Sequence, residues 1–337
     1  MPKTLKVENV QAESGEKNFG FVKVAETPSD SVSLPVWIIN GNKDGPTLCL
    51  TAGLHPCEYV AVEAVIRTCR KLEPSNLHGT IIAVPVINIP AFRARSPYVN
   101  PIDNVNLMFL YPAMPNGSIS HRIVHVVLNE IIAKADYHID CHGGEPNEAM
   151  DPYVVFPKVN NEEVDTKSEA MARIFGLADL DRRTPERAKG LFLEAAKMGV
   201  PSIMSEAGGI GVITEEDVAI HMNGIRNILQ YVGILDGSPQ INVRHKIEEK
   251  KFDVVADRGG IAYRTVGTGT IVSAGQKVAE IKDLQGETVS VLEAPDNGKI
   301  KLIFTYTVVN TGDPIMTGWA MKDAGLFPQT DKFYVGK

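Results

Sequence analysis

Two short segments about eighty residues apart constrain this chain of 337 residues more than any other feature. Gly-Leu-His55-Pro-Cys-Glu58 follows the apolar run Pro46–Ala52, and His138-Ile-Asp140-Cys-His142-Gly-Gly follows the apolar run Ala133–Ile139. Each segment places imidazole and carboxylate groups where a strand would pass into a loop. In open α/β sheets, ligands bind at this carboxyl edge. The sequence therefore predicts one site built by two strand ends.

Three of these side chains form a candidate zinc site. His55 and Glu58 are three residues apart, so at the start of a helix both can reach one cation. Residues 59–72 are apolar at helical spacing, which predicts that helix. With His142, the set has two imidazoles and one carboxylate and leaves a fourth position open, as catalytic zinc sites do. For the His55/Glu58 pair alone, the alternative is an ordinary helix start with a solvated Glu.

Two further carboxylates extend the predicted site. Asp140 is interpreted as the partner of a ligating imidazole, although it could instead cap the following loop. Glu206 ends a short apolar strand and is the candidate base that takes a proton from water and delivers it to a leaving amine. The alternative is that Glu206 caps the next helix. That helix already has Thr214 as its N-cap with Asp217 three residues on, which is close to a capping box.

With His55, Glu58, His142 and Glu206 in this order, residues from about 30 to 235 resemble the succinylglutamate desuccinylase/aspartoacylase family, a branch of the zinc carboxypeptidase-like hydrolases. Members hold one zinc with His, Glu and His, and use a Glu as general base. They cleave the amide of N-acylated amino acids and related small compounds. The resemblance implies these roles for the four residues.

The resemblance also implies an Arg that polarises the scissile carbonyl. Arg93 and Arg95 are the two candidates, and the family pattern favours Arg95. For either one, a structural arginine that extends along the surface is the alternative.

The segment 103–113 departs from the family pattern. Where the family usually has an Asn-Arg pair that grips a substrate carboxylate, this chain has Met108-Phe109. A guanidinium fork is thus replaced by an apolar surface, against which an unpaired carboxylate would be costly to bury. We therefore expect an amide less anionic or more apolar than the family's usual substrates. The candidate substrate-binding residues are Asn106, Met108, Phe109 and Tyr111.

Strand-like and helical patterns alternate from Pro46 to Gly237, which predicts an α/β fold. We expect a mostly parallel mixed sheet flanked by helices, as in zinc carboxypeptidases, within a catalytic domain at 1–240 whose first 45 residues are β-rich. Two stretches without clear periodicity, 89–120 and 145–151, are expected to wall the substrate pocket. Short β-like runs after residue 245 predict a second domain at 245–330, similar to lipoyl/biotinyl-type β-sandwiches and with a structural or oligomer-forming role.

Composition excludes several classes of partner. The net charge of −7 leaves no basic footprint for nucleic acid or an anionic membrane. The chain has no run of eighteen apolar residues and no apolar core of a signal peptide near Met1, so we expect a cytoplasmic protein. Cys57 and Cys141 are expected to be small apolar filler, His138 a packed strand residue and His221 a surface residue. One Zn²⁺ per chain and a small-molecule substrate are expected, and homo-oligomer formation stays open.

The activity that the resemblance implies is zinc-dependent hydrolysis of the amide bond of a small N-acylated compound, that is, a deacylase acting on linear C–N bonds other than peptide bonds. Two alternatives remain. A metallocarboxypeptidase is disfavoured by Phe109 in place of the family Arg. A non-catalytic protein that binds a metal or small ligand is disfavoured by Glu206, because binding alone has no need of that carboxylate.

Overall fold

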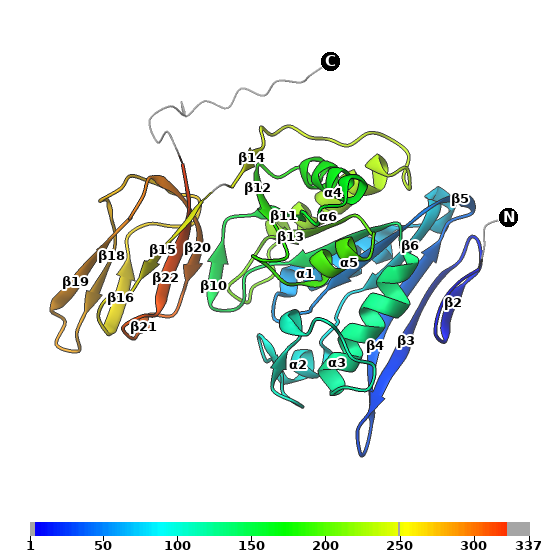
Figure 1. Ribbon diagram of the computed structural model, residues 1–337, viewed down its shortest axis with the longest axis horizontal. Helices are drawn as coiled ribbons and strands as arrows, with labels where there is room; N and C mark the ends of the chain where they lie inside the picture. The colour runs from blue at the N-terminus through cyan, green and yellow to red at the C-terminus, as the bar shows by residue number, and fades with distance from the viewer. Residues whose placement is uncertain (1–3, 249, 322–337) are drawn as a thin grey trace.

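A mixed sheet forms the centre of the computed structural model, which describes residues 4–248 and 250–321 (Figure 1). The order of its strands is β14-β12-β11-β13-β9-β5-β6-β4-β3. Parallel pairing joins β14, β12 and β11, and also β13, β9, β5 and β6, whereas β11–β13, β6–β4 and β4–β3 are antiparallel. The strands span β3 (Lys17–Glu26), β4 (Ser31–Asn40), β5 (Lys43–Ala52), β6 (His78–Val84), β9 (Tyr137–His142), β11 (Tyr153–Pro157), β12 (Asp179–Arg183), β13 (Ser202–Glu206) and β14 (Lys246–Ile247).

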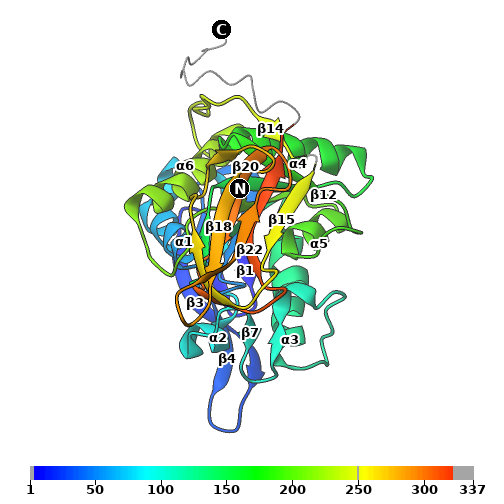
Figure 2. The same cartoon turned by 90° about the vertical axis from the view of Figure 1, so that its left-hand side faces the viewer.

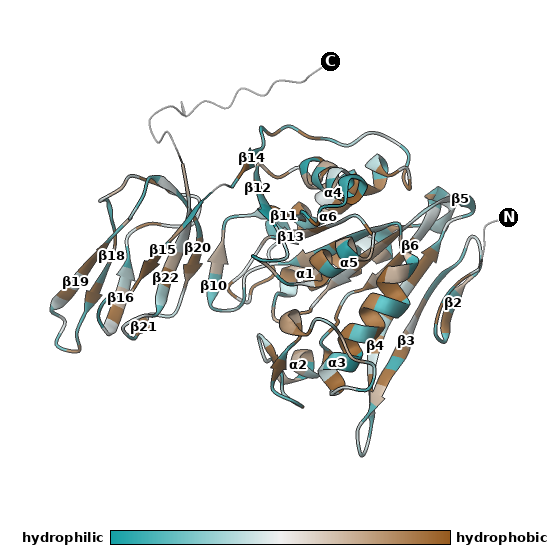
Figure 3. Cartoon of the chain, in the orientation of Figure 1, coloured by the Kyte–Doolittle hydropathy of each residue, from teal (hydrophilic) through white to brown (hydrophobic). Residues whose placement is uncertain are grey.

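Helices cover both faces of this sheet (Figures 1 and 2). One face packs against α1 (Tyr59–Lys71), α4 (Glu162–Phe175) and α6 (Glu215–Tyr231), and the other against α3 (Ile119–Val126) and α5 (Leu191–Lys197). Successive strand residues face opposite sides, so Ile38 and Ile82 belong to one buried cluster while their neighbours Ile39 and Ile81 belong to the other. Strand β4 is consequently apolar on both faces, and hydrophobic residues appear brown along it in Figure 3.

Smaller elements lie between these strands and helices. The hairpin of β1 (Leu5–Val7) and β2 (Val10–Ala12) contacts β3 and β4. The segment 89–120, which was predicted to lack regular structure and to wall the substrate pocket, contains several short elements. These are helix α2 (Ile89–Ala94), the two short strands β7 (Val99–Asn100) and β8 (Val105–Asn106), and the 3₁₀ turn η2 (Leu107–Phe109). Further single turns are η1 (Pro74–Asn76), the π-helical η3 (Val127–Ile131) and η4 (Ile132–Lys134).

The predicted α/β pattern is confirmed, with specific omissions. The spacing of apolar residues predicts a helix at 168–174, which in the structure is the second half of a longer α4. Helix α5, helix α2 and strand β12 were not predicted. The capping interpretation is confirmed, because the Thr214 hydroxyl accepts a hydrogen bond from the backbone N–H of Asp217 at 3.1 Å. Among the described residues, no helix is long and apolar enough to cross a membrane. The four cysteines are buried and free.

The C-terminal part consists of two further sheets around a separate apolar core (Figure 2). One sheet has the order β10-β20-β22-β15, with β17 also paired to β20, and the other has the order β19-β18-β16-β21. The strands are β10 (Glu148–Met150), β15 (Lys251–Val255), β16 (Gly260–Arg264), β17 (Ile271–Val272), β18 (Lys277–Lys282), β19 (Thr288–Glu293), β20 (Gly298–Phe304), β21 (Val308–Val309) and β22 (Pro314–Ala320). The β-like runs predicted after residue 245 are confirmed as strands, and β22 is an addition. The lipoyl-like assignment and the division near residue 245 stay predictions.

Strand β10 comes from the α/β part of the chain but pairs with β20 of the C-terminal part. Its partners place Glu148 opposite Phe304 and Met150 opposite Leu302. The C-terminal sheet therefore holds the segment that directly follows His142. A buried ion cluster reinforces this junction, because Lys301 is 1% exposed and bonds both Asp151 and Asp179.

Candidate functional site

The three predicted metal ligands lie together at the carboxyl edge of the central sheet. His55 and Glu58 follow β5, and His142 ends β9, the strand that pairs in parallel with β5. Gly53, with φ +62°, turns the chain at the end of β5, a conformation that favours glycine. Because the two strands run side by side in the same direction, residues about eighty positions apart in sequence meet at one point.

The donor atoms of these three residues converge on one small volume. Nδ1 of His55 lies 3.0 Å from Oε1 of Glu58, and Nδ1 of His142 lies 3.0 Å from Oε2 of the same carboxylate. One donor atom from each residue lies within 4.8 Å of the others, and all three residues are buried. Oε2 of Glu58 has no hydrogen-bond partner despite its closeness to His142. Oε1 of Glu58 is hydrogen-bonded to Nδ1 of His55, whereas Oε2 is a buried acceptor without a donor. Such an oxygen beside two imidazoles fits a shared cation, and two imidazoles with one carboxylate suit zinc.

The electrostatics of the cluster also suit a cation. Burial alone would lower the pKa of His142, but the carboxylates of Glu58 and Asp140 outweigh burial and raise that pKa well above its ordinary value. Burial would raise the pKa of Glu58, yet the two histidines lower it. The pocket thus stabilises positive charge at its centre, and a divalent ion can take the place of the proton that His142 would otherwise hold.

Asp140 stands behind His142 and is fully buried. Its Oδ2 lies 3.2 Å from Nε2 of His142, the nitrogen that faces away from Glu58. Its Oδ1 accepts a 2.6 Å hydrogen bond from the hydroxyl of Thr51 on β5. This contact is the arrangement expected of a carboxylate that orients a ligating imidazole. Asp140 lies inside β9 and so does not cap the loop that follows.

Glu206 reaches the same edge from the next strand. It ends β13, which pairs in parallel with β9, and it is buried with Oε2 unpartnered. Burial raises the pKa of Glu206 well above its ordinary value, and the negative charges of Glu58 and Glu148 act in the same direction, against the opposing effect of His142. Because Thr214 caps α6, the alternative role of Glu206 as that cap is excluded. A carboxyl beside the cluster with a raised affinity for protons can accept and return one.

A cavity of about 340 Å³ opens over the cluster. Its walls come from the ligand segments, from Tyr98 and Met108 of the long wall segment, from β10, β11 and β13, and from Leu302 of β20. Two cations line it as well: Arg183, whose guanidinium lies 2.6 Å from Asp181, and the exposed Lys189. The cavity therefore joins an apolar wall to charged groups of both signs.

The predicted arginines do not line this cavity. Arg93 has an exposed side chain that lies 3.4 Å from Asp30 on the surface. Arg95 follows α2 in the left-handed conformation, with φ +56°, and is also exposed. The unpredicted helix α2 is the physical reason, since it turns this segment so that both side chains project to the surface. A catalytic role for Arg93 or Arg95 stays a prediction, and neither residue is among those that line the cavity in this structure.

The predicted substrate-binding residues divide into two groups. Met108 lines the cavity, and Oδ1 of Asn106 lies 3.3 Å from Nε2 of His55. Phe109 is 59% exposed and lies outside the cavity lining, while Tyr111 packs against the apolar cluster below α3. The 3₁₀ turn η2 separates Met108 and Phe109 to different sides.

Two histidines outside the ligand set are buried and hydrogen-bonded. His138 lies within 2.8 Å of the hydroxyls of Thr51 and Ser202, as expected for a packed strand residue. The prediction that His221 is exposed is wrong, because it is fully buried, with Nδ1 3.0 Å from the Ser205 hydroxyl. Helix α6 packs against α1 and α4, and the helical pattern alone did not reveal that the hydroxyl of Ser205 on β13 lies within hydrogen-bond distance of His221.

Sequence reasoning missed Glu145 and Glu148 as site residues, although it placed their segment at the pocket wall. Both line the cavity, and Oε1 of Glu145 lies 4.0 Å from Nδ1 of His55. Burial, together with the charges of Glu58 and Glu148, raises the pKa of Glu145 to about 9. Two carboxylates directly after the third ligand were the available signal.

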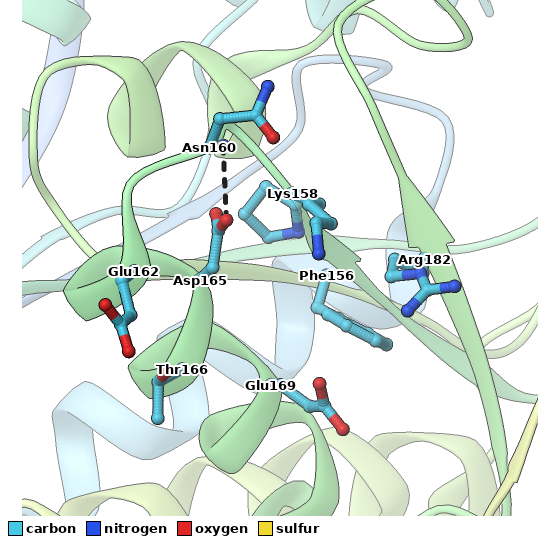
Figure 4. Close-up of a pocket in the computed structure, with 9 residues that line it drawn as sticks. Phe156, Lys158, Asn160, Glu162, Asp165, Thr166, Glu169 and Arg182 are labelled. Atoms are coloured by element: carbon cyan, nitrogen blue, oxygen red, sulfur yellow. Dashed lines mark hydrogen bonds between the residues drawn. The ribbon is translucent and has the colours of Figure 1, made fainter.

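A second cavity, of about 420 Å³, lies at the start of α4 (Figure 4). Its main carboxylate, Asp165, accepts hydrogen bonds from the backbone N–H groups of Val159 and Asn160 at 2.7 and 3.1 Å. These bonds hold the turn that precedes α4, so the acidic group is already used in local structure. None of the three predicted ligands nor Glu206 lines this cavity.

Comparisons with known proteins agree with the predicted resemblance. A profile described as the succinylglutamate desuccinylase/aspartoacylase catalytic domain matches residues 44–232. An N-alpha-acetyl-L-2,4-diaminobutyric acid deacetylase from Halomonas elongata is 27% identical over 317 residues, which cover 91% of this chain and 92% of that protein.

Solved structures share the fold over nearly the whole chain. A product-bound ectoine utilization protein EutE (DoeB) from Ruegeria pomeroyi superposes with a TM-score of 0.85 at 23% identity, covering 95% of this chain and 99% of the other. A succinylglutamate desuccinylase/aspartoacylase from Rhodobacter sphaeroides gives a TM-score of 0.81 at 23% identity, with 90% and 95% covered. The α/β part and the added C-terminal strands therefore occur together in known structures.

Proposed function

Because this chain belongs to the succinylglutamate desuccinylase/aspartoacylase family, we propose that it is a zinc-dependent hydrolase that cleaves the amide bond of a small N-acylated compound. The observation that carries the proposal is the convergence of His55, Glu58 and His142, with Glu206 on the adjacent strand. The Halomonas deacetylase, which is similar over nine-tenths of both chains, supports amide hydrolysis as the reaction.

Each residue of the site has a part in this reaction. His55, Glu58 and His142 would hold the zinc, and Asp140 orients the His142 ring from behind. When bound, zinc supplies Lewis acidity that polarises a carbonyl and makes water easier to deprotonate. Glu206 accepts the proton of the attacking water and returns it to the departing nitrogen. The buried position of Glu206 keeps that carboxyl from bulk solvent.

We further propose that the substrate is less anionic than the usual N-acyl amino acids of the family. Met108 presents an apolar side chain to the cavity at the position where the family pattern has an amide of its Asn-Arg pair. Phe109, at the arginine position, lies outside the cavity lining. The cavity thus lacks the arginine that the family pattern provides for a substrate carboxylate. The basic residues that line it are Arg183, which is paired with Asp181, and the exposed Lys189.

Hydrolysis of a panel of N-acyl amino acids and neutral amides tests the reaction. We expect turnover that a chelator abolishes, that added zinc restores and that Glu206→Gln removes. Zinc bound at one equivalent with no turnover of any amide would contradict the proposal and favour a ligand-binding role. Pairs of substrates with free and amidated carboxyl groups test the second point, and a strong preference for the free acids would refute it.

A further inference from the structure

The walls of the cavity over the ligand cluster are of two kinds. The predicted ligands, Glu206 and the carboxylates that follow His142 form a polar wall at the strand ends. The other wall is largely apolar and includes Met150, Tyr153, Val155, Phe192, Met204 and Leu302. No step of the hydrolysis proposed above uses these six side chains. An apolar surface inside a cavity favours the binding of an apolar part of a small molecule.

Strand pairing places this apolar wall directly beside Glu206. Strands β11 and β13 are antiparallel, with Tyr153 opposite Glu206 and Val155 opposite Met204. Residues opposite each other project from the same face with their Cβ atoms about 5 Å apart, and so do residues two apart along one strand, such as Met204 and Glu206. All four side chains line the cavity. The candidate base is therefore one corner of a patch whose other three corners are Tyr153, Val155 and Met204.

Helix α5 covers this patch. It packs against β11 and β13, and the ring of Phe192 belongs to the same buried cluster as Val155 and Met204. Gly190, which precedes α5, has φ +140°, and a Cβ there would lie 3.1 Å from the ring of Phe192 and 4.0 Å from Cε of Met108. The glycine thus gives room to two apolar side chains that line the cavity.

The C-terminal part of the chain completes the apolar wall. Met150 of β10 is opposite Leu302 of β20, and both line the cavity. The ring of Tyr153 packs edge-on against the ring of Trp319 on β22, with 5.1 Å between the ring centroids. With a volume of about 340 Å³, the cavity has room for several carbon atoms beyond an amide group, since one water molecule takes about 30 Å³.

We propose that this apolar wall is a subsite for the group on the nitrogen of the scissile amide, so that the amine released carries a hydrocarbon chain or an aromatic ring. The inference rests on the proposed function, since Glu206 returns a proton to the departing nitrogen and so lies beside it. The patch that begins at Glu206 then meets the substituent of that nitrogen.

Met108 supports this side of the amide. It stands where the family pattern has a residue of the pair that grips a substrate carboxylate, and the carboxylate of an N-acyl amino acid belongs to its amino part. Met108 lines the cavity and presents a thioether there instead of a hydrogen-bond donor. The amino part of the substrate therefore meets an apolar surface from two segments of the chain.

Binding of two isomeric amides tests the proposal without requiring turnover. N-hexylacetamide and N-ethylhexanamide contain the same atoms, but only the first carries its long chain on the nitrogen. In calorimetry on zinc-loaded Glu206→Gln protein, we expect N-hexylacetamide to bind at least roughly tenfold more tightly than its isomer and than N-ethylacetamide, because each buried methylene contributes about a fourfold gain in affinity. Equal affinities of the two isomers or of the two acetamides, or tighter binding of N-ethylhexanamide, would overturn the proposal.

Variants assign the preference to the apolar wall. Adding Met204→Gln, which keeps the length of the side chain but makes it polar, should lower the ratio of the N-hexylacetamide and N-ethylacetamide affinities by roughly tenfold. Met198→Gln is the matched control and should leave the ratio unchanged, because Met198 is exposed and lies outside this cavity lining. Met150→Gln, at a half-buried position of the wall, should lower the ratio as well. An unchanged ratio in folded, zinc-loaded Met204→Gln or, where that variant does not fold, in Met150→Gln would overturn the role of this wall.

Turnover separates this inference from the proposed function. If zinc-loaded wild-type protein hydrolyses N-ethylacetamide and N-hexylacetamide with equal kcat/KM, the function stands and the inference fails. If no amide is hydrolysed while the calorimetric preference for N-hexylacetamide persists and depends on Met204, the hydrolase assignment fails and the apolar binding site stands.

Discussion

Glu206 is the register partner of His142 in the parallel pairing of β13 with β9. Residues paired across a sheet project from the same face, so the backbone ladder alone places this carboxyl beside the predicted ligand. Glu206 needs no side-chain contact to hold it there, and its Oε2 is unpartnered. The position of the candidate base is therefore set by strand register.

Replacing Glu206 by Gln should abolish proton transfer while leaving the ligand cluster in place. We expect the rate constant for turnover to fall by about a hundredfold to ten-thousandfold, because a positioned general base contributes on that scale. The measurement is steady-state kinetics alongside elemental analysis of bound zinc. A variant that retains both its zinc and its activity would show that Glu206 is not the base.

Asp140→Asn should weaken zinc binding about tenfold to a hundredfold, because the carboxylate behind His142 orients that ring and raises its basicity. Competition with a chromophoric chelator measures the affinity. Thr51→Val removes only the hydroxyl that donates to Asp140 and should have a smaller effect in the same direction. Unchanged affinity in Asp140→Asn would refute a supporting role for this residue.

Lys301 joins the C-terminal sheet to the α/β part through buried contacts with Asp151 and Asp179. Lys301→Ala would leave these carboxylates with only Lys299 as a partner, so we expect a loss of about 3 kcal/mol in the free energy of unfolding. Lys250→Ala breaks an exposed pair with Asp296 and should cost less than about 1 kcal/mol. Denaturant titration measures the free energy of unfolding of both variants. Equal losses would contradict the prediction that the buried Lys301 contributes more to stability than the exposed Lys250.

His221 should make the protein less stable in acid. Burial lowers the pKa of His221 from 6.5 to about 4. Between these two pH values the imidazole is therefore protonated in the unfolded chain but neutral in the folded protein. The difference in pKa therefore affects the free energy of unfolding. The contribution of His221 to that free energy is complete above pH 6.5 and is lost as the pH falls toward 4, by an amount on the order of 3 kcal/mol.

The measurement is the free energy of unfolding of wild type and of His221→Gln from pH 7 to pH 4. The advantage of the wild type should shrink as the pH falls. His138, whose pKa burial also lowers to about 4, is present in both proteins, so its contribution cancels. A difference that stays constant with pH would show that His221 is not neutral in the folded state.

The predictable parts of the site are those that follow strand ends. His55, Glu58, His142 and Glu206 each lie at the end of an apolar run or one turn beyond it, and parallel pairing brings such ends together. Arg95 was predicted from a family pattern instead, and the local geometry of α2 decided its position. A position that strand pairing sets can be predicted from the sequence, whereas the direction of a loop side chain depends on contacts that a linear pattern does not encode.

The sequence by itself determined the alternation of strands and helices, the zinc-type donor set and the β-rich C-terminal part, because these depend on local periodicity and on residue type. Only the tertiary structure decided that β10 pairs with β20. That pairing links residues more than a hundred positions apart and fixes Glu145 and Glu148 at the cavity. The sequence could not show that Glu145 is buried and that neither of its carboxylate oxygens has a hydrogen-bond partner, because burial depends on which distant segments pack around a residue.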